Sequence, residues 1–164
     1  MIDIQAVTSP DEKSAICRAV LEALPAWFGN SAAINDYTNK VRALPFYAAC
    51  DASQTVGFLA ILEHNAHTAE VCVMGILPAY HRHGIGRRLI ARCEAHCAAA
   101  GKAFLTVKTL DASADYAPYD ATRTFYLSMG FLPLEVFPLH WDAENPCLFL
   151  AKAISENSDL SMKT

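Results

Sequence analysis

The sequence has few charged residues and little positive charge. Only 18% of its 164 residues are Asp, Glu, Lys or Arg, and 13 basic residues against 17 acidic ones give a net charge of −4. A protein that binds nucleic acid needs a surplus of basic side chains to displace the counterions of the phosphate backbone. The overall charge therefore argues against a nucleic-acid partner. Only a local basic patch would be compatible with one.

Long apolar runs and paired cysteines are also missing. No stretch reaches the roughly 18 uninterrupted apolar residues of a membrane helix, and residues 1–10 lack the basic region and apolar run of a signal peptide. Six scattered cysteines without a Cys-x-x-Cys pair favour buried, reduced thiols. Cys93, His96 and Cys97 are explained better by core thiols beside a surface histidine than by a metal. We expect a cytoplasmic protein with no membrane partner and no metal.

The sequence does have a regular succession of strand and helix patterns. With 53% hydrophobic residues the chain can bury one core, so a single domain over residues 1–154 is expected, with a frayed polar tail over residues 155–164. The predicted strands are 1–7, 46–50, 55–64, 69–77, 104–110, 131–138 and 147–154. The predicted helices are 9–24, 31–44, 84–100 and 121–129. This order implies an α/β fold with a mixed sheet and helices on both faces.

Two of the predicted helices have a defined apolar face. The face of helix 84–100 is formed by Ile85, Leu89, Ile90, Cys93 and Cys97. The face of helix 121–129 is formed by Ala121, Phe125 and Met129. Tyr126 then lies about 100° round the second helix, a position from which it can face the cleft.

The most informative segment joins strand 69–77 to helix 84–100. It contains the sequence His81-Arg82-His83-Gly84-Ile85-Gly86-Arg87-Arg88. Unpaired N–H groups and the helix dipole at a helix start favour a bound phosphate, and glycines let the phosphate approach the backbone. The basic side chains add positive charge in an otherwise acidic chain. We therefore interpret this turn as a candidate phosphate site.

Two other phosphate motifs do not fit this turn. A dinucleotide fingerprint needs a third glycine where Leu89 stands, and a P-loop needs Lys followed by Ser or Thr where the sequence has Arg87-Arg88. A tight strand-to-helix connection without a ligand is the alternative for a Gly-x-Gly turn taken alone.

Residues 71–90 resemble the acyl-CoA-binding motif of the GNAT superfamily of N-acetyltransferases: a strand, Pro, an aromatic residue, Gln/Arg-x-x-Gly-x-Gly/Ala and a helix. Leu77-Pro78-Ala79-Tyr80 and Gly84-Ile85-Gly86 match this pattern, while His81 replaces the usual Gln or Arg. Residues 122–131 are similar to the family's late helix, Ala-x-x-Phe-Tyr-x-x-x-Gly-Phe. The resemblance covers about residues 2–154 and implies the GNAT fold, with a mostly antiparallel mixed sheet.

The resemblance also implies acetyl-CoA as co-substrate and a primary amine, small molecule or peptide, as acceptor. The implied cofactor-binding residues are Met74, Gly75, Ile76, Arg82, His83, Gly84, Ile85, Gly86 and Arg87. A bulge near Gly75 would let main-chain N–H groups meet the pantetheine arm or the thioester carbonyl. A non-catalytic acyl-CoA sensor is the alternative function, and a homodimer is compatible with the sequence.

In this family the amine attacks the thioester directly, so the reaction needs a base for the amine and an acid for the leaving thiolate. The motif implies that Tyr126 is the acid, with a packing tyrosine as the alternative. Glu70, on the same strand face as Cys72, is the predicted base; Glu63 is the other candidate, and a solvated strand-end acid would explain either. Cys72 lacks a visible base partner, so core packing is a better interpretation than a covalent acyl carrier.

Segments that border the acceptor site in this family contain aromatic and acidic residues. The aromatic residues are Trp27, Phe28, Tyr37, Tyr116 and Tyr119, and the acids are Asp111, Asp115, Asp120, Glu135, Asp142 and Glu144. Aromatic walls and carboxylates would suit a cationic amine, although ordinary loop packing would use the same residues. The sequence does not identify the amine, the acyl-chain length or the oligomeric state.

Overall fold

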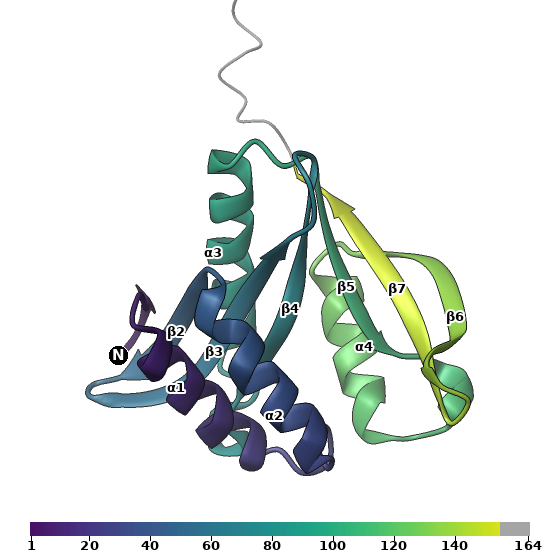
Figure 1. The fold of residues 1–164 in the computed structure, drawn as a ribbon, viewed down its shortest axis with the longest axis horizontal. Helices are drawn as coiled ribbons and strands as arrows, with labels where there is room; N and C mark the ends of the chain where they lie inside the picture. Colours follow the sequence, from purple (N-terminus) through teal and green to yellow (C-terminus); the bar gives the residue numbers. More distant parts are fainter. Residues whose placement is uncertain (155–164) are drawn as a thin grey trace, which may run out of the picture. The chain divides into compact units, whose positions relative to one another are not determined.

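A computed structural model describes residues 1–154 of the chain, so the predicted fraying of 155–164 lies outside the described residues. The strands are β1 (Ile2–Ala6), β2 (Phe46–Asp51), β3 (Gln54–Glu63), β4 (Thr68–Ile76), β5 (Phe104–Leu110), β6 (Leu132–Asp142) and β7 (Asn145–Ala153). The helices are α1 (Pro10–Glu22), α2 (Ser31–Lys40), α3 (Ile85–Ala99) and α4 (Pro118–Ser128), shown in Figure 1. Short 3₁₀ segments are Val41–Ala43, Pro78–Tyr80 and Ala112–Ala114.

The seven strands hydrogen-bond in the order β1-β2-β3-β4-β5-β7-β6. Strands β4 and β5 pair in parallel, whereas the pairs β1–β2, β2–β3, β5–β7 and β6–β7 are antiparallel. The predicted fold class, a mixed and mostly antiparallel sheet with helices, is therefore confirmed. Within this connectivity the described chain forms two compact units: residues 1–62 with 71–93, and residues 63–70 with 94–154. The single domain expected over residues 1–154 stays a prediction.

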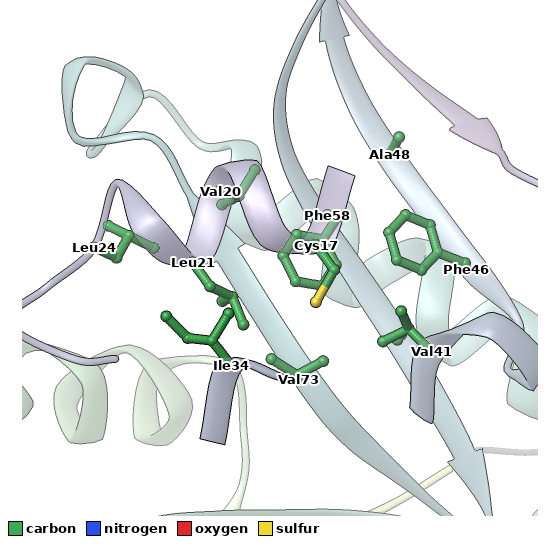
Figure 2. Packing of buried hydrophobic residues seen from close by; sticks show 11 residues of the cluster. Cys17, Val20, Leu21, Leu24, Ile34, Val41, Phe46, Ala48, Phe58 and Val73 are labelled. Atoms are coloured by element: carbon green, nitrogen blue, oxygen red, sulfur yellow. The ribbon is translucent and has the colours of Figure 1, made fainter. Parts of the chain in front are cut away.

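In the first unit, α1 and α2 pack their apolar sides on one face of the strands. The buried cluster consists of Cys17, Val20, Leu21, Leu24, Ile34, Val41, Phe46, Ala48, Phe58, Ala60 and Val73 (Figure 2). The rings of Phe46 and Phe58 stack with centroids 5.1 Å apart. Burial raises the pKa of Cys17 to about 12, so its thiol stays protonated at neutral pH. The six cysteines, which all lie within the described residues, form no disulfide there, as expected, and four of them are buried.

Helix α3 packs on the opposite face of the first unit. Successive residues of a strand point to opposite faces, so Tyr47 points away from the cluster that contains Phe46 and Ala48. The guanidinium of Arg92, on α3, lies 5.1 Å from the centre of the Tyr47 ring. The predicted apolar face of α3 is confirmed, since Ile85, Leu89, Ile90, Cys93 and Cys97 are each no more than 1% exposed. Helices thus cover both faces of the first unit.

In the second unit, the first residues of β4 lie beside β5. The parallel register pairs Thr68 with Phe104, Ala69 with Leu105 and Glu70 with Thr106. Strand β5 pairs along its whole length with β7, and β6 forms the outer edge. Every residue of β6 is exposed. Its large apolar side chains are Leu132, Leu134, Val136, Phe137, Leu139 and Trp141, which are 37–73% exposed.

Three element boundaries differ from the sequence prediction by three residues or more. Helix α4 begins at Pro118 rather than at 121, because proline at the first helical position needs no N–H partner. Helix α2 ends at Lys40 and continues as a 3₁₀ turn to Ala43. Strand β6 extends past 138 to Asp142, whose carboxylate accepts hydrogen bonds from the backbone N–H groups of Glu144 and Asn145 and so forms the turn into β7.

The predicted core face of α4 is confirmed for Met129 but is wrong for Ala121 and Phe125. Ala121 is exposed and Phe125 is half-buried, whereas Tyr126 is 6% and Met129 8% exposed. The ring that packs inward is that of Tyr126 and not that of its neighbour Phe125. Tyr126 therefore belongs to the buried side of α4 and not to an open face.

Candidate active site

The turn between β4 and α3 has the geometry of an anion site. Gly84 adopts a φ of +78°, a conformation that other residues rarely adopt, and its carbonyl accepts the first α-helical hydrogen bond, from Arg88. The N–H groups of residues 85–87 precede that bond and have no partner within the helix. A Cβ placed on Gly84 would meet no atom within 4 Å. The backbone at this helix start is therefore open to a phosphate, which the helix dipole also favours.

Two side chains hold this turn in place. His81 Nε2 lies 2.7 Å from the carbonyl oxygen of Ile76, so the imidazole bridges the end of β4 and is not directed at a phosphate. Trp27 packs edge-on against the same ring, with centroids 5.9 Å apart. The Tyr80 hydroxyl donates to Asp51 over 3.0 Å, and this hydrogen bond raises the pKa of Tyr80. The residue that replaces the family's Gln or Arg thus has a structural contact in the turn.

The basic residues of the turn divide into two groups. Arg82, His83 and Arg87 are exposed, and Arg82 adopts a left-handed φ of 63°. Arg88 instead donates through Nη1 to the carbonyl of Ile2, 2.7 Å away, which holds β1 against α3. Ile85 and Gly86 are buried at the helix start. Of the three arginines in the turn, Arg88 therefore already has a hydrogen-bond partner in the fold.

The three β4 residues predicted to meet the pantetheine arm alternate in burial. Met74 and Ile76 are half-buried, and Gly75 is buried on the side of Val73. A Cβ on Gly75 would lie 3.0 Å from side-chain atoms of both Val20 and Leu24. Gly75 is thus required for close packing of the α1 region on β4, a role that the sequence did not suggest. The bulge expected near Gly75 stays a prediction.

Glu70 lies at the centre of a small polar cluster in the second unit. Its Oε1 atom is 2.7 Å from Lys108 Nζ and 2.7 Å from His64 Nε2. The Glu70 side chain is 9% exposed, Lys108 24% and His64 39%. Lys108 also lies 5.5 Å from the centre of the Phe149 ring. The predicted base is therefore an ion-paired, covered carboxylate rather than a solvated acid at a strand end.

Glu63, the alternative base, is engaged elsewhere. Its carboxylate lies 3.4 Å from His96 Nε2 and 3.6 Å from Lys102 Nζ. These contacts tie the end of β3 to α3 and to the turn after it. These two contacts indicate that Glu63 stabilises the fold rather than acting as a base.

Tyr126 is held by aromatic contacts in the second unit. Its ring lies 5.6 Å from Phe131 and 5.3 Å from Phe125, centre to centre. The Tyr126 carbonyl accepts the N–H of Phe131, and Gly130 between them has a φ of 93°, which ends α4 in a left-handed cap. The spacing from Tyr126 to Phe131 in the motif therefore has a packing role, beside the catalytic role predicted for Tyr126.

Four of the five aromatic residues predicted to border the acceptor pair with one another within each unit, whereas Trp27 packs against His81. Phe28 packs edge-on against Tyr37 at 6.1 Å in the first unit. Tyr116 and Tyr119 lie 6.1 Å apart in the second, where burial raises the pKa of Tyr119 to about 12. Their placement fits both an aromatic wall and ordinary loop packing.

Three of the six candidate acceptor acids have structural partners. Asp111 accepts from the hydroxyl and N–H of Ser113, and the hydroxyl contact is the main cause of its lowered pKa. Asp120 pairs with Arg123, and Asp142 forms the β6–β7 turn. Only Asp111 of the set is half-buried, and the other five acids are exposed.

Sequence reasoning missed His64 and Lys108. His64 follows the last residue of β3, and Lys108 stands 38 residues beyond Glu70 on β5. The one available signal was a lysine within the apolar strand Phe104–Leu110, since a half-buried lysine usually has an acidic partner. Glu70 and Tyr126 both belong to the second unit, whereas all the predicted cofactor residues belong to the first.

Neither a metal site nor a membrane helix was found in the described part of the chain. Among residues 1–154, no group of three or more His, Cys, Asp and Glu side chains could hold a metal ion. No helix in the same range is long and apolar enough to cross a bilayer. That the protein works without a metal stays a prediction.

A known family model matches the middle of the sequence. Residues 42–133, more than half of the chain, match the model of the acetyltransferase (GNAT) domain. The protein therefore belongs to the GNAT family, which confirms the resemblance found in its two motifs. No curated protein sequence gives a significant match.

Solved structures of the same fold are similar to the chain over almost its whole length. A GNAT-family protein from Desulfovibrio desulfuricans has a TM-score of 0.81 at 16% identity, over 94% of this chain and all of that one. The ribosomal-protein-S18-alanine N-acetyltransferase of Escherichia coli has a TM-score of 0.73 at 15% identity, with both chains fully covered. An aminoglycoside 6'-N-acetyltransferase solved with coenzyme A has a TM-score of 0.72 at 17% identity, over 96% and 99% of the chains. At these identities the likeness establishes the fold.

Proposed function

We propose that the protein transfers the acetyl group of acetyl-CoA to a primary amine, which attacks the thioester directly while both substrates are bound. The observation that carries this proposal is the β4–α3 turn in a chain of the GNAT family. Its open Gly84, its unpaired N–H groups and the exposed Arg82 and Arg87 suit the pyrophosphate of coenzyme A. A cytoplasmic location, the absence of nucleic-acid and membrane partners, and a homodimer remain part of the proposal.

Two residues of the second unit supply the proton chemistry in this proposal. Glu70 belongs to the polar group that takes the proton of the amine, and Tyr126 gives its hydroxyl proton to the leaving sulfur. A phenol with a pKa near 10 can protonate a developing thiolate with a pKa near 8.5 when the two are in contact. The residues of the turn bind and orient the acetyl donor. The acceptor is a small amine or a peptide, the two classes on which the aminoglycoside and ribosomal-protein acetyltransferases act.

The test is a panel of primary amines incubated with acetyl-CoA and the purified protein. We expect thiol release that depends on the amine, together with an acetylated product identified by mass spectrometry. A reaction without amine gives the background of thioester hydrolysis. If coenzyme A binds but no amine in a panel of polyamines, aminoglycosides, amino acids and peptides is acetylated, the sensor function replaces the enzyme.

Arg87→Gln is expected to weaken coenzyme A binding about 10- to 100-fold, because a charge-assisted hydrogen bond to a phosphate contributes about 1.5–3 kcal/mol. The control is Arg92→Gln on the same helix, which removes the same charge but lies over Tyr47 in the fold. Titration calorimetry with coenzyme A measures both. Equal affinity for Arg87→Gln and the wild type would remove this arginine from the phosphate site.

A further inference from the structure

The cluster around Glu70 contains an exposed imidazole beside a covered carboxylate. His64 Nε2 and Lys108 Nζ each lie 2.7 Å from the same oxygen, Glu70 Oε1. The side chain of His64 is 39% exposed, against 9% for Glu70. An amine arriving from solvent therefore reaches the imidazole more readily than the carboxylate. All three residues belong to the second unit, so this arrangement lies within one compact part of the chain.

We propose that His64 is the catalytic base that accepts the amine proton, and that Glu70 is the positioning residue that orients the ring and balances its charge. This inference rests on the proposed acetyl transfer to an amine. It assigns a role to a residue that neither motif contains. Glu70 keeps its importance for the reaction but acts through His64.

The hydrogen bond to Glu70 determines which ring nitrogen is available. An ionised carboxylate can only accept hydrogen bonds, so Nε2 of the neutral ring carries the hydrogen and donates it to Glu70. Nδ1 then holds the lone pair and can accept a proton. Within residues 1–154, no hydrogen bond to Nδ1 is formed. The backbone N–H of His64 is bonded to the Thr68 carbonyl over 3.0 Å, which anchors the residue in the β3–β4 turn.

The Glu70 carboxylate already forms an ion pair with Lys108. A proton on its carboxylate would weaken the ion pair with Lys108, an ammonium group only 24% exposed, and desolvated cations are costly without a partner. A proton on His64 instead makes the imidazole a cation next to the Glu70 carboxylate, which keeps its ion pair with Lys108. The geometry is that of a carboxylate–histidine pair, in which the acid fixes the tautomer and stabilises the imidazolium.

The other titratable groups near the cluster do not compete for this proton. Burial raises the pKa of the Cys147 thiol, with Lys108 opposing and Glu70 reinforcing the shift, so Cys147 stays neutral. Glu63, next to His64 in the sequence, is paired with His96 and Lys102. Before the reaction the charges of Glu70 and Lys108 cancel, and afterwards the cluster carries the single positive charge of His64.

The proton balance of the step is closed by solvent. As the amine nitrogen bonds to the carbonyl carbon, its N–H proton moves to Nδ1 of His64 and the N–H electron pair stays on nitrogen. The carbon–sulfur bond breaks with its electron pair going to sulfur, which takes the hydroxyl proton of Tyr126. The imidazolium then loses its proton to water and the phenolate regains one. The products are the acetylated amine and the free thiol.

The first test compares His64→Gln with His67→Gln on the best acceptor of the amine panel. His67 is an exposed histidine of the same turn and lies outside the cluster. His64→Gln is expected to lower kcat/KM about 10²-fold, in the range of general base catalysis, and to flatten the acidic limb of its pH profile. Coenzyme A affinity and melting temperature should match the wild type, as should all properties of His67→Gln. An unchanged rate and pH profile in His64→Gln would overturn the proposal.

The second test is chemical rescue. Added imidazole should restore part of the lost rate to His64→Ala, because the site is exposed to solvent, but should not affect Glu70→Gln. Glu70→Gln should keep the acidic limb while its rate falls. If Glu70→Gln abolishes the limb and His64→Gln keeps it, Glu70 is the base and the proposal is wrong. A wild-type protein that acetylates no amine would refute the proposed function itself, whereas equal wild-type and His64→Gln rates would refute this inference alone.

Discussion

Tyr126→Phe is expected to lower kcat by about 10²- to 10⁴-fold, the usual contribution of general acid catalysis. The substitution removes only the hydroxyl that protonates the leaving sulfur. The ring keeps its contacts with Phe131 and Phe125, 5.6 and 5.3 Å away, so the stability of α4 should change little. Single-turnover kinetics with saturating acetyl-CoA measures the chemical step directly. The coenzyme A dissociation constant should stay nearly constant.

The leaving group and a second tyrosine provide the controls for Tyr126. The rate loss should shrink when the leaving thiol is made more acidic, because a better leaving group needs less protonation. Tyr47→Phe, which removes a hydroxyl from a buried tyrosine of the first unit, should keep the wild-type rate. An equal loss in coenzyme A affinity and in kcat/KM would instead make Tyr126 a binding contact and favour the sensor function. Full single-turnover activity in Tyr126→Phe would exclude it as the acid.

Lys108→Met is expected to lower the free energy of unfolding by about 2–3 kcal/mol. It leaves the charge of Glu70, a side chain only 9% exposed, without its ammonium partner, and an uncompensated buried charge is strongly destabilising. The full penalty of about 3–5 kcal/mol is reduced because Lys108 is 24% exposed and His64 still donates to Glu70. Urea denaturation monitored by circular dichroism measures the change.

The double variant Lys108→Met/Glu70→Gln separates lost charge pairing from lost packing. Neutralising both partners should recover most of the stability, since no unpaired charge remains. The exposed pair of Arg42 and Asp11, 2.7 Å apart, is the comparison: Arg42→Met should cost at most about 1 kcal/mol. A double variant as unstable as Lys108→Met would mean that the lysine stabilises β5 by packing, and that Glu70 tolerates isolation.

The sequence predicted well those features that a short window of residues determines. Strand β5 was predicted with its observed bounds, and the apolar face of α3 follows a regular helical spacing. The β4–α3 turn was recognisable because Gly84 and Gly86 have a local, backbone-level reason to be there. The start of α4 was misplaced because Pro118 was assigned to a loop, although proline is favoured at the first position of a helix.

The sequence could not predict contacts between distant residues. Nothing near Glu70 indicates that Lys108, 38 positions later, will pair with it, because that contact depends on the parallel register of β4 and β5. Phe125 and Tyr126 are adjacent aromatic residues, and helical periodicity alone did not determine which of the two rings packs into the core. Gly75 likewise fits a ligand-binding strand and a packing site equally well until Val20 and Leu24 are placed beside it. These are consequences of tertiary packing rather than of local pattern.

The outer strand β6 is an exposed, apolar edge strand, a feature that favours aggregation through strand pairing. Eleven exposed residues rich in leucine and aromatic side chains at a sheet edge invite a strand from another molecule to continue the ladder. Pro133 and Pro138 lie within this strand and carry no N–H, and the pairing with β7 is irregular near both. An incoming strand would meet missing donors and a broken register. The strand can therefore expose apolar side chains while its backbone disfavours edge-to-edge pairing with a strand of another molecule.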